Sequence, residues 1–302
     1  MKAVSGPDFF DRNGIISVGV LLQWRMRHAR PQVAWDAWTS LGQYLDYLRE
    51  QGIGVNVVPF VGNGTLRTLC VGLDDRPATG HEIAAMARLV DRAMDEGAWG
   101  VSSGLIYPPS HYASTDELVA LCTAAAARDG FYFTHIRGEG ATLLAAIEEA
   151  IEIGRRAGLP VQIAHLKAAG QDYWPLWDRA LALIDEARQE GIEVCADRYP
   201  YIASSTTLAN QLPDWARDGG QEASLARLQD AQTRERILAS MDQRHAHWTK
   251  IVLAQAPDTP DLVGLNVAQV ADRRGVPPQE AALQLLQENE LSVWILHFSM
   301  SE

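Results

Sequence analysis

One strand–helix–strand unit decides how this chain folds: Phe131-Tyr-Phe-Thr-His135-Ile-Arg-Gly-Glu139, an amphipathic segment over 142–157, and Val161-Gln-Ile-Ala-His165-Leu-Lys167. Each apolar run ends in a histidine, and each follows a segment with helical spacing that ends in glycine. The two runs therefore predict neighbouring parallel strands joined by a right-handed crossover. Both imidazoles would then lie at the carboxyl ends of the strands, where β/α barrels build their active sites.

The same alternation of helix, glycine and strand runs through much of the chain. Glycines at 97, 130, 158 and 191 end successive predicted helices and lie roughly 30 residues apart, the length of one strand–helix unit. This spacing fits both a β/α barrel and an open doubly wound sheet. Polar residues at many strand ends favour the barrel, because an open sheet binds ligands mainly at its switch point. These polar residues are Asn63, Ser103, His135, His165 and Asp197.

The number of predicted strands is smaller than a closed barrel requires. The pattern predicts five strand–helix units and a sixth barrel strand near 293–298, whereas a barrel of this type has eight strands. A polar loop is expected over 203–220. We therefore predict an α/β fold, an incomplete (β/α)8 TIM-barrel-type hydrolase domain over 33–302, preceded by a leader of uncertain structure over 1–32.

The composition is typical of a globular protein of the cytoplasm. The chain has 302 residues, 47% of them hydrophobic, and a formal net charge of −12. This acidic balance argues against nucleic acid or an anionic membrane as a partner. No apolar run reaches the roughly 18 residues of a transmembrane helix. Cys70, Cys122 and Cys195 form no C-x-x-C pair, so we expect a reducing compartment without a disulfide framework.

His135 and His165 are the main candidates for chemistry. A single histidine of this kind is usually a core residue bonded to a backbone carbonyl. Two histidines at matching strand ends instead predict a metal site, because two neutral imidazoles make half of a zinc site. Zinc lowers the pKa of bound water to about 7 and polarises carbonyl groups.

Lys167 and Arg137 each lie two residues after one of these histidines, so on a strand they point to the same side. Each suits a substrate carboxylate or the reacting carbonyl, and each suits equally well an ion pair with Glu139 or Asp197. Asp197 is itself a candidate carboxylate near the metal, or a structural cap.

Three tyrosines, Tyr107, Tyr199 and Tyr201, follow predicted strands. A tyrosine at a barrel mouth can donate a hydrogen bond to a developing oxyanion. For each of them taken alone, ordinary loop packing is the simpler explanation.

Six segments, taken in this order, resemble one known family. They are Asn56-Val-Val-Pro-Phe-Val-Gly-Asn-Gly-Thr-Leu-Arg67, Gly100-Val-Ser-Ser-Gly-Leu-Ile-Tyr-Pro-Pro109, Thr134-His-Ile-Arg-Gly-Glu139, Ala164-His-Leu-Lys-Ala-Ala-Gly170, Asp197-Arg-Tyr-Pro-Tyr201 and Phe298-Ser-Met-Ser-Glu302. With them the chain resembles the N-acyl-D-amino-acid deacylase (D-aminoacylase) family of the amidohydrolase superfamily.

The resemblance implies a hydrolase that uses Zn²⁺ to cleave a small-molecule substrate, an N-acyl-D-amino acid, into a carboxylate and a D-amino acid. It implies that His135 and His165 are zinc ligands. Residues that would line the substrate site by the same resemblance are Tyr107, Lys167, a tyrosine of Tyr199-Pro-Tyr201, and Ser204 or Ser205.

The chain also departs from this family. Members carry His-x-His on the first barrel strand, a cysteine ligand in an Asn-Cys-Gly segment, and a general-base aspartate in a Gly-Ser-Asp segment that would fall beyond Glu302. These departures predict a central fragment of a longer enzyme. Two alternatives stay open: a non-catalytic remnant with a binding or structural role, and an amidohydrolase acting on cyclic amides or other N-acyl amino acids. The sequence predicts neither the number of metals nor the oligomeric state.

Overall fold

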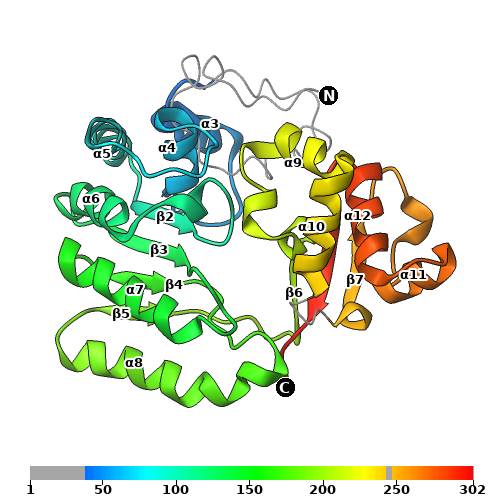
Figure 1. Ribbon diagram of the computed structural model, residues 1–302. Coiled ribbons are helices and arrows are strands. Elements are labelled where there is room, and N and C mark those ends of the chain that lie inside the picture. Colours follow the sequence, from blue (N-terminus) through cyan, green and yellow to red (C-terminus); the bar gives the residue numbers. More distant parts are fainter. Residues whose placement is uncertain (1–37, 243–246, 302) are drawn as a thin grey trace. The chain divides into compact units, whose positions relative to one another are not determined.

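In the computed structural model, which describes residues 38–242 and 247–301, the chain divides into two units (Figure 1). Of the described residues, the first unit comprises 38–72, 76–166 and 176–198, and the second comprises 73–75, 167–175, 199–242 and 247–301. The predicted leader over 1–32 lies outside the described residues.

A five-stranded parallel sheet, with its strands in chain order, forms the centre of the first unit. Its strands are β1 (Val61–Gly62), β2 (Gly100–Gly104), β3 (Phe131–His135), β4 (Val161–Ile163) and β5 (Val194–Ala196). The helices of this unit are α3 (Leu41–Gln51), α4 (Asn63–Cys70), α5 (Gly80–Asp95), α6 (Thr115–Ala126), α7 (Leu143–Ala157) and α8 (Trp177–Gln189). Helices α5 to α8 pack side by side along the sheet (Figure 1). This alternation confirms the predicted strand–helix units.

Short-range signals set the ends of these helices. Thr79 and Glu82 form a capping box at the start of α5, in which each side chain bonds to the other residue's backbone N–H. Gly158 ends α7 with a left-handed backbone, φ 72°, which glycine adopts without a steric penalty. The chain therefore turns into β4 at the point that the sequence predicts.

Strand β3 has two different faces. Tyr132 and Thr134 are completely buried, whereas Phe131, Phe133 and His135 on the opposite face are only partly buried. His135 therefore lies on the more accessible face of the sheet, where a ligand can reach it.

A buried polar network joins α4 to α6. Glu117 pairs with Arg67 and accepts a hydrogen bond from Asn63 Nδ2 at 3.1 Å. Asn63 in turn accepts a hydrogen bond from Ser110, and Arg67 and Asn63 have no exposed surface. Burial raises the pKa of Glu117, and the Arg67 guanidinium acts in the opposite direction. Asn63, expected to be a polar residue of the barrel mouth, is thus engaged in this internal network.

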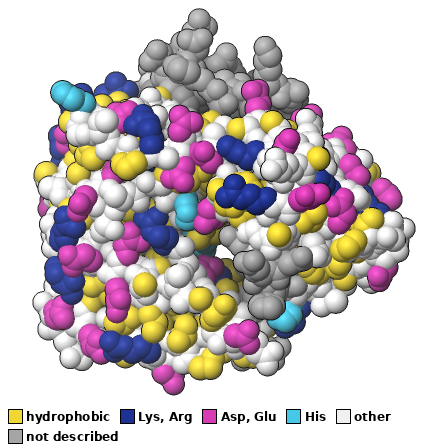
Figure 2. Space-filling view, in the orientation of Figure 1, with side chains coloured by type: hydrophobic (Ala, Val, Ile, Leu, Met, Phe, Trp, Pro, Cys, Tyr) yellow, Lys and Arg dark blue, Asp and Glu magenta, His cyan; other side chains and the backbone are white. Residues whose placement is uncertain are grey.

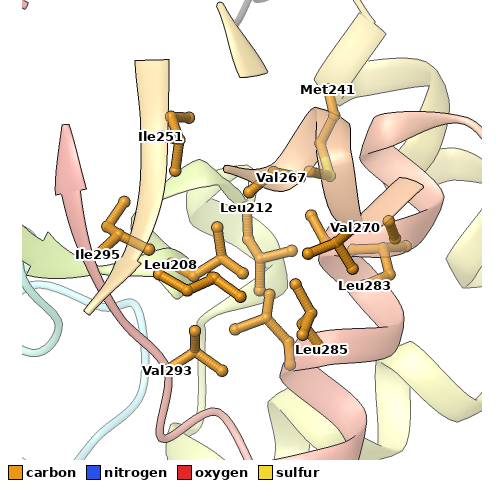
Figure 3. Packing of buried hydrophobic residues seen from close by; sticks show 14 of the residues in the cluster. Leu208, Leu212, Met241, Ile251, Val267, Val270, Leu283, Leu285, Val293 and Ile295 are labelled. Atoms are coloured by element: carbon orange, nitrogen blue, oxygen red, sulfur yellow. The ribbon is translucent and has the colours of Figure 1, made fainter. Parts of the chain in front are cut away.

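The second unit is built on a three-stranded antiparallel sheet with the order β6–β8–β7. The strands are β6 (Ala203–Thr207), β7 (Ile251–Gln255) and β8 (Trp294–Phe298), and the helices are α9 (Gly220–Gln229), α10 (Ala231–Asp242), α11 (Val267–Arg274) and α12 (Pro278–Glu288). Figure 3 shows the core of this unit, in which side chains of the sheet and of the helices point toward one another. Members of this core include Leu208, Ile251, Val270, Leu283 and Ile295.

Two expectations about this part of the chain are wrong. The run near 293–298 is not a further parallel barrel strand, because β8 pairs antiparallel with both β6 and β7. The stretch expected to be a loop from 203 begins with β6, whose residues Ala203-Ser-Ser-Thr-Thr207 are small and polar. Such a strand owes its pairing to a distant partner rather than to a local apolar pattern.

Among the described residues, no helix combines the length and the apolar character needed to cross a membrane.

Candidate metal centre

The structure brings His135 and His165 into direct contact. His135 is the last residue of β3, and His165 follows β4, which pairs with β3 in parallel. His135 Nδ1 lies 2.7 Å from His165 Nε2, and the two ring centroids are 4.4 Å apart. Two predicted ligands 30 residues apart in the chain are thus neighbours at one edge of the sheet.

His165 has an unusual backbone that Asp197 holds in place. Its φ is +39°, in the left-handed region that non-glycine residues seldom occupy. The backbone N–H of His165 donates to Asp197 Oδ1 at 2.6 Å, and Gln162 donates to the other oxygen of Asp197 at 2.9 Å. Asp197 was suggested as a carboxylate near the metal or as a structural cap. These hydrogen bonds give it the structural role, as the acceptor that fixes the chain at the end of β4.

Glu139 is the third member of the group. Its Oε1 lies 3.0 Å from His165 Nδ1, on the other ring nitrogen from the one that faces His135. Within residues 38–242 and 247–301, His135, Glu139 and His165 form a group of potential ligand atoms that all lie within 4.8 Å of one another. Sequence reasoning considered Glu139 only as an ion-pair partner for Arg137 or Lys167. The missed signal is its position in the same short segment as His135.

This set of donors fits a zinc ion. Imidazole nitrogens are ligands that zinc prefers, and a nearby carboxylate can either bind the ion or accept a hydrogen bond from a ligating histidine. In a tetrahedral site with zinc–nitrogen bonds of about 2.0–2.1 Å, two ligand nitrogens lie about 3.3 Å apart. The facing nitrogens, 2.7 Å apart, would have to separate only by a small rotation of the rings to admit the ion.

Tyr107 lies beside the histidine pair. It follows β2 in the loop after Gly104, and its ring centroid is 5.6 Å from that of His135. Its side chain remains partly exposed. Of the predicted substrate residues, Tyr107 is thus one that the structure brings next to the candidate ligands.

Arg137 is held by protein groups on several sides. Its guanidinium donates to both carboxylate oxygens of Glu149 on α7, at 2.8 and 2.9 Å. It also donates to the backbone carbonyls of His111 and Ala113, at 2.7 and 2.9 Å. The partner is Glu149 rather than either of the carboxylates that the sequence suggested. Arg137 therefore ties the chain after β3 to α7 and to the turn before α6.

The remaining predicted residues belong to the second unit. Lys167 is buried, and its Nζ lies 5.4 Å from the centroid of the Tyr199 ring. The rings of Tyr199 and Tyr201 stack with their centroids 6.4 Å apart. Ser204 and Ser205 lie on β6, opposite His297 and Leu296 of β8.

Comparison with known proteins gives a consistent result. No protein-family model matches the sequence. The D-aminoacylase of Alcaligenes xylosoxydans xylosoxydans is 40% identical over 191 residues, which cover 61% of this chain and 39% of that protein. The N-acyl-D-glutamate deacylase of the same organism is 35% identical over 179 residues, covering 59% of this chain and 37% of that protein.

Solved structures agree. The N-acyl-D-glutamate deacylase of Bordetella bronchiseptica, complexed with zinc and a phosphonate inhibitor, superposes with a TM-score of 0.71 at 28% identity, over 87% of this chain and 48% of that chain. A D-aminoacylase that defines a novel subset of amidohydrolases gives a TM-score of 0.69 at 31% identity, over 88% of this chain and 48% of that chain. This chain is related to the N-acyl-D-amino-acid deacylases.

The relationship confirms two predictions made from the sequence motifs. The first is the resemblance to the deacylases. The second is the α/β barrel-type fold class. The structural neighbours are barrel hydrolases, and the first unit carries a parallel sheet whose strands are connected by helices. The chain spans 39% of the length of the curated D-aminoacylase and 48% of each solved deacylase chain.

Proposed function

We propose that this chain is part of a zinc-dependent hydrolase that cleaves the amide bond of N-acyl-D-amino acids, releasing a carboxylate and a D-amino acid. The observation that carries the proposal is the contact between His135 and His165, 2.7 Å apart, in a chain 40% identical to a D-aminoacylase over their aligned residues. The related deacylase bound to zinc and to a mimic of the tetrahedral intermediate supports the same chemistry.

In this proposal His135 would hold the ion through Nδ1 and His165 through Nε2, because these nitrogens face each other. When bound, zinc supplies a Lewis acid that polarises the amide carbonyl and lowers the pKa of water. Each ligating nitrogen must offer a lone pair, so both imidazoles have to be neutral when they bind.

The proposed substrate contacts are polar side chains that the resemblance to the deacylases implies. We assign the substrate carboxylate to Lys167, since a buried ammonium group interacts strongly with an anion. Tyr107, beside His135, is a hydroxyl donor suited to a developing oxyanion. Tyr199, Tyr201, Ser204 and Ser205 offer further hydroxyl groups, as the resemblance implies. Arg137, with its bonds to Glu149 and two carbonyls, is given a positioning role instead.

A small molecule is the proposed partner, and the cytoplasm the proposed location. Figure 2 shows acidic and basic side chains intermixed on the visible face, without a large basic patch of the kind that nucleic acids require. The free thiols of Cys70, Cys122 and Cys195 support a reducing compartment.

The test is a hydrolysis assay with N-acetyl-D-amino acids, N-acetyl-L-amino acids and cyclic amides. It uses the zinc-loaded chain and the same chain fused to the flanking segments of the related D-aminoacylase. We expect hydrolysis of the D substrates, with a loss of more than about 100-fold on replacing His165 by alanine, as for removal of other catalytic groups. Undiminished activity in H165A, or a preference for cyclic amides, would overturn the proposal.

A further inference from the structure

We propose that Glu139 is a positioning residue that fixes the tautomer of His165, so that Nε2 of this histidine offers its lone pair to the metal. The inference rests on the metal site of the proposed function, but it is independent of the substrate.

The two nitrogens of His165 have different partners. Nδ1 lies 3.0 Å from Glu139 Oε1, and Nε2 lies 2.7 Å from His135 Nδ1. An ionised carboxylate only accepts hydrogen bonds, so the proton of His165 belongs on Nδ1. A neutral imidazole carries one N–H, and Nε2 is therefore left with a lone pair.

This assignment also fixes the state of His135 before a metal binds. Because His165 Nε2 accepts, His135 Nδ1 must be the donor across the 2.7 Å contact. The chain of hydrogen bonds thus runs from His135 through His165 to Glu139. To hold an ion between the facing nitrogens, the neutral imidazole of His135 would carry its proton on Nε2 instead of Nδ1, with no change in its number of protons.

Glu139 contacts the ring nitrogen of His165 that does not face His135, so it acts as a hydrogen-bond partner of a ligating histidine rather than as a ligand. The two nitrogens of an imidazole point to different sides of the ring, so an ion at Nε2 has Glu139 on the far side. Carboxylates in this position orient the ring and raise the basicity of the ligating nitrogen.

The surroundings keep Glu139 in place. Its segment follows Arg137, whose bonds to Glu149 and to the carbonyl of His111 anchor the chain after β3. The side chain of Glu139 is only 15% exposed, which limits competition from water for its hydrogen bond. A carboxylate held in this way can orient His165 before any ion binds.

The experiment uses the whole chain with Glu139→Ala and Glu139→Gln. Glu152→Ala, which removes an exposed carboxylate of α7 paired with Arg155, is the matched control. Nitrogen-15 NMR of the zinc-free proteins reports which ring nitrogen of His165 is protonated, and competition with a chelator gives the Zn²⁺ affinity. Circular dichroism melting verifies that each variant is folded.

We expect E139A to lose the single Nδ1–H tautomer of His165 and to bind Zn²⁺ about 10- to 100-fold more weakly, the usual effect of removing such a carboxylate. E139Q keeps an acceptor oxygen, so it should retain the tautomer and lose less affinity. E152A should match the unmodified chain.

Two results would overturn the inference. One is an unchanged His165 tautomer together with unchanged affinity in E139A. The other is a loss in both Glu139 variants as large as that in His135→Ala, which would make Glu139 a direct ligand. Neither result depends on hydrolysis, so failure here is distinct from failure of the proposed activity.

Discussion

Asp197 accepts a 2.6 Å hydrogen bond from the backbone N–H of His165, and His165 has a φ of +39°. A left-handed backbone at a non-glycine residue costs on the order of 1 kcal/mol or more, and such residues cluster at functional sites. The carboxylate of Asp197 thus stabilises the strained backbone that presents the ring of His165.

Replacing Asp197 by alanine should therefore weaken zinc binding as well as the fold. We expect a loss of about 1–2 kcal/mol in the free energy of unfolding, because a hydrogen bond to a charged group disappears and the left-handed backbone of His165 loses the acceptor that stabilises it. Zinc affinity should fall by about 10-fold as the ring of His165 loses its fixed position. Urea unfolding and chelator competition measure the two effects. Asp197→Asn keeps an acceptor oxygen, so its stability and its zinc affinity should lie between those of the unmodified chain and of Asp197→Ala. A complete loss of zinc binding in Asp197→Asn would instead identify Asp197 as a ligand.

Arg137 should contribute to stability rather than to substrate affinity. Its guanidinium bonds to Glu149 and to the carbonyls of His111 and Ala113, and its side chain is 28% exposed. Arg137→Ala should lower the free energy of unfolding by about 2 kcal/mol, since it leaves Glu149 and two carbonyls with fewer donors. Arg137→Lys should recover only part of this loss, because an ammonium group cannot make the bidentate contact with Glu149. Unchanged stability with a raised KM for the acyl substrate would instead support a substrate contact.

The ion pair between Arg67 and Glu117 should be the most sensitive of the pairs described here. Both side chains are buried, with 0% and 1% exposure. Glu117→Ala should destabilise the chain by about 3–5 kcal/mol, because the Arg67 charge is left buried without its carboxylate. The matched control is Asp116→Ala, which breaks the exposed pair with Arg156 and should cost at most about 1 kcal/mol. Equal losses in the two variants, measured by urea unfolding, would contradict this view of the network.

Short-range patterns predicted the first unit well. The glycine stop at Gly158 and the histidines at two strand ends each depend on a few neighbouring residues, and the structure shows all of them. The same reasoning predicted the neighbourhood of His135 and His165, because adjacent parallel strands end at the same edge of a sheet.

Local sequence patterns did not predict contacts between residues that are far apart in the chain. Glu149 lies on a helix, so no strand rule links it to Arg137. Strand β6 consists of small polar residues, and its pairing with β8 joins segments about 90 residues apart. Of the apolar segment over 55–61, only Val61 lies in β1, and Val55 is 73% exposed. In each case a tertiary contact, rather than the local sequence, decides the outcome.

The start of α5 should make stability depend on pH in the acid range. A hydrogen bond from Arg76, together with the backbone N–H of Thr79, lowers the pKa of Glu82 from 4.5 to about 2. The folded chain then binds this proton less readily than the unfolded chain does. The contribution of Glu82 is therefore fully present above pH 4.5 and is lost as the pH falls from 4.5 toward 2.

Glu82→Gln tests this directly, because its side chain no longer titrates. Thermal unfolding followed by circular dichroism at several pH values should show the two proteins diverging above pH 4.5 and converging near pH 2. The difference should be small, since Glu82 and Arg76 are partly exposed and water and salt screen their interaction. Glu152→Gln, in an exposed pair with Arg155, is the control and should follow the unmodified chain more closely. A constant difference between E82Q and the unmodified chain across this range would show that the effect is one of capping geometry and not of charge.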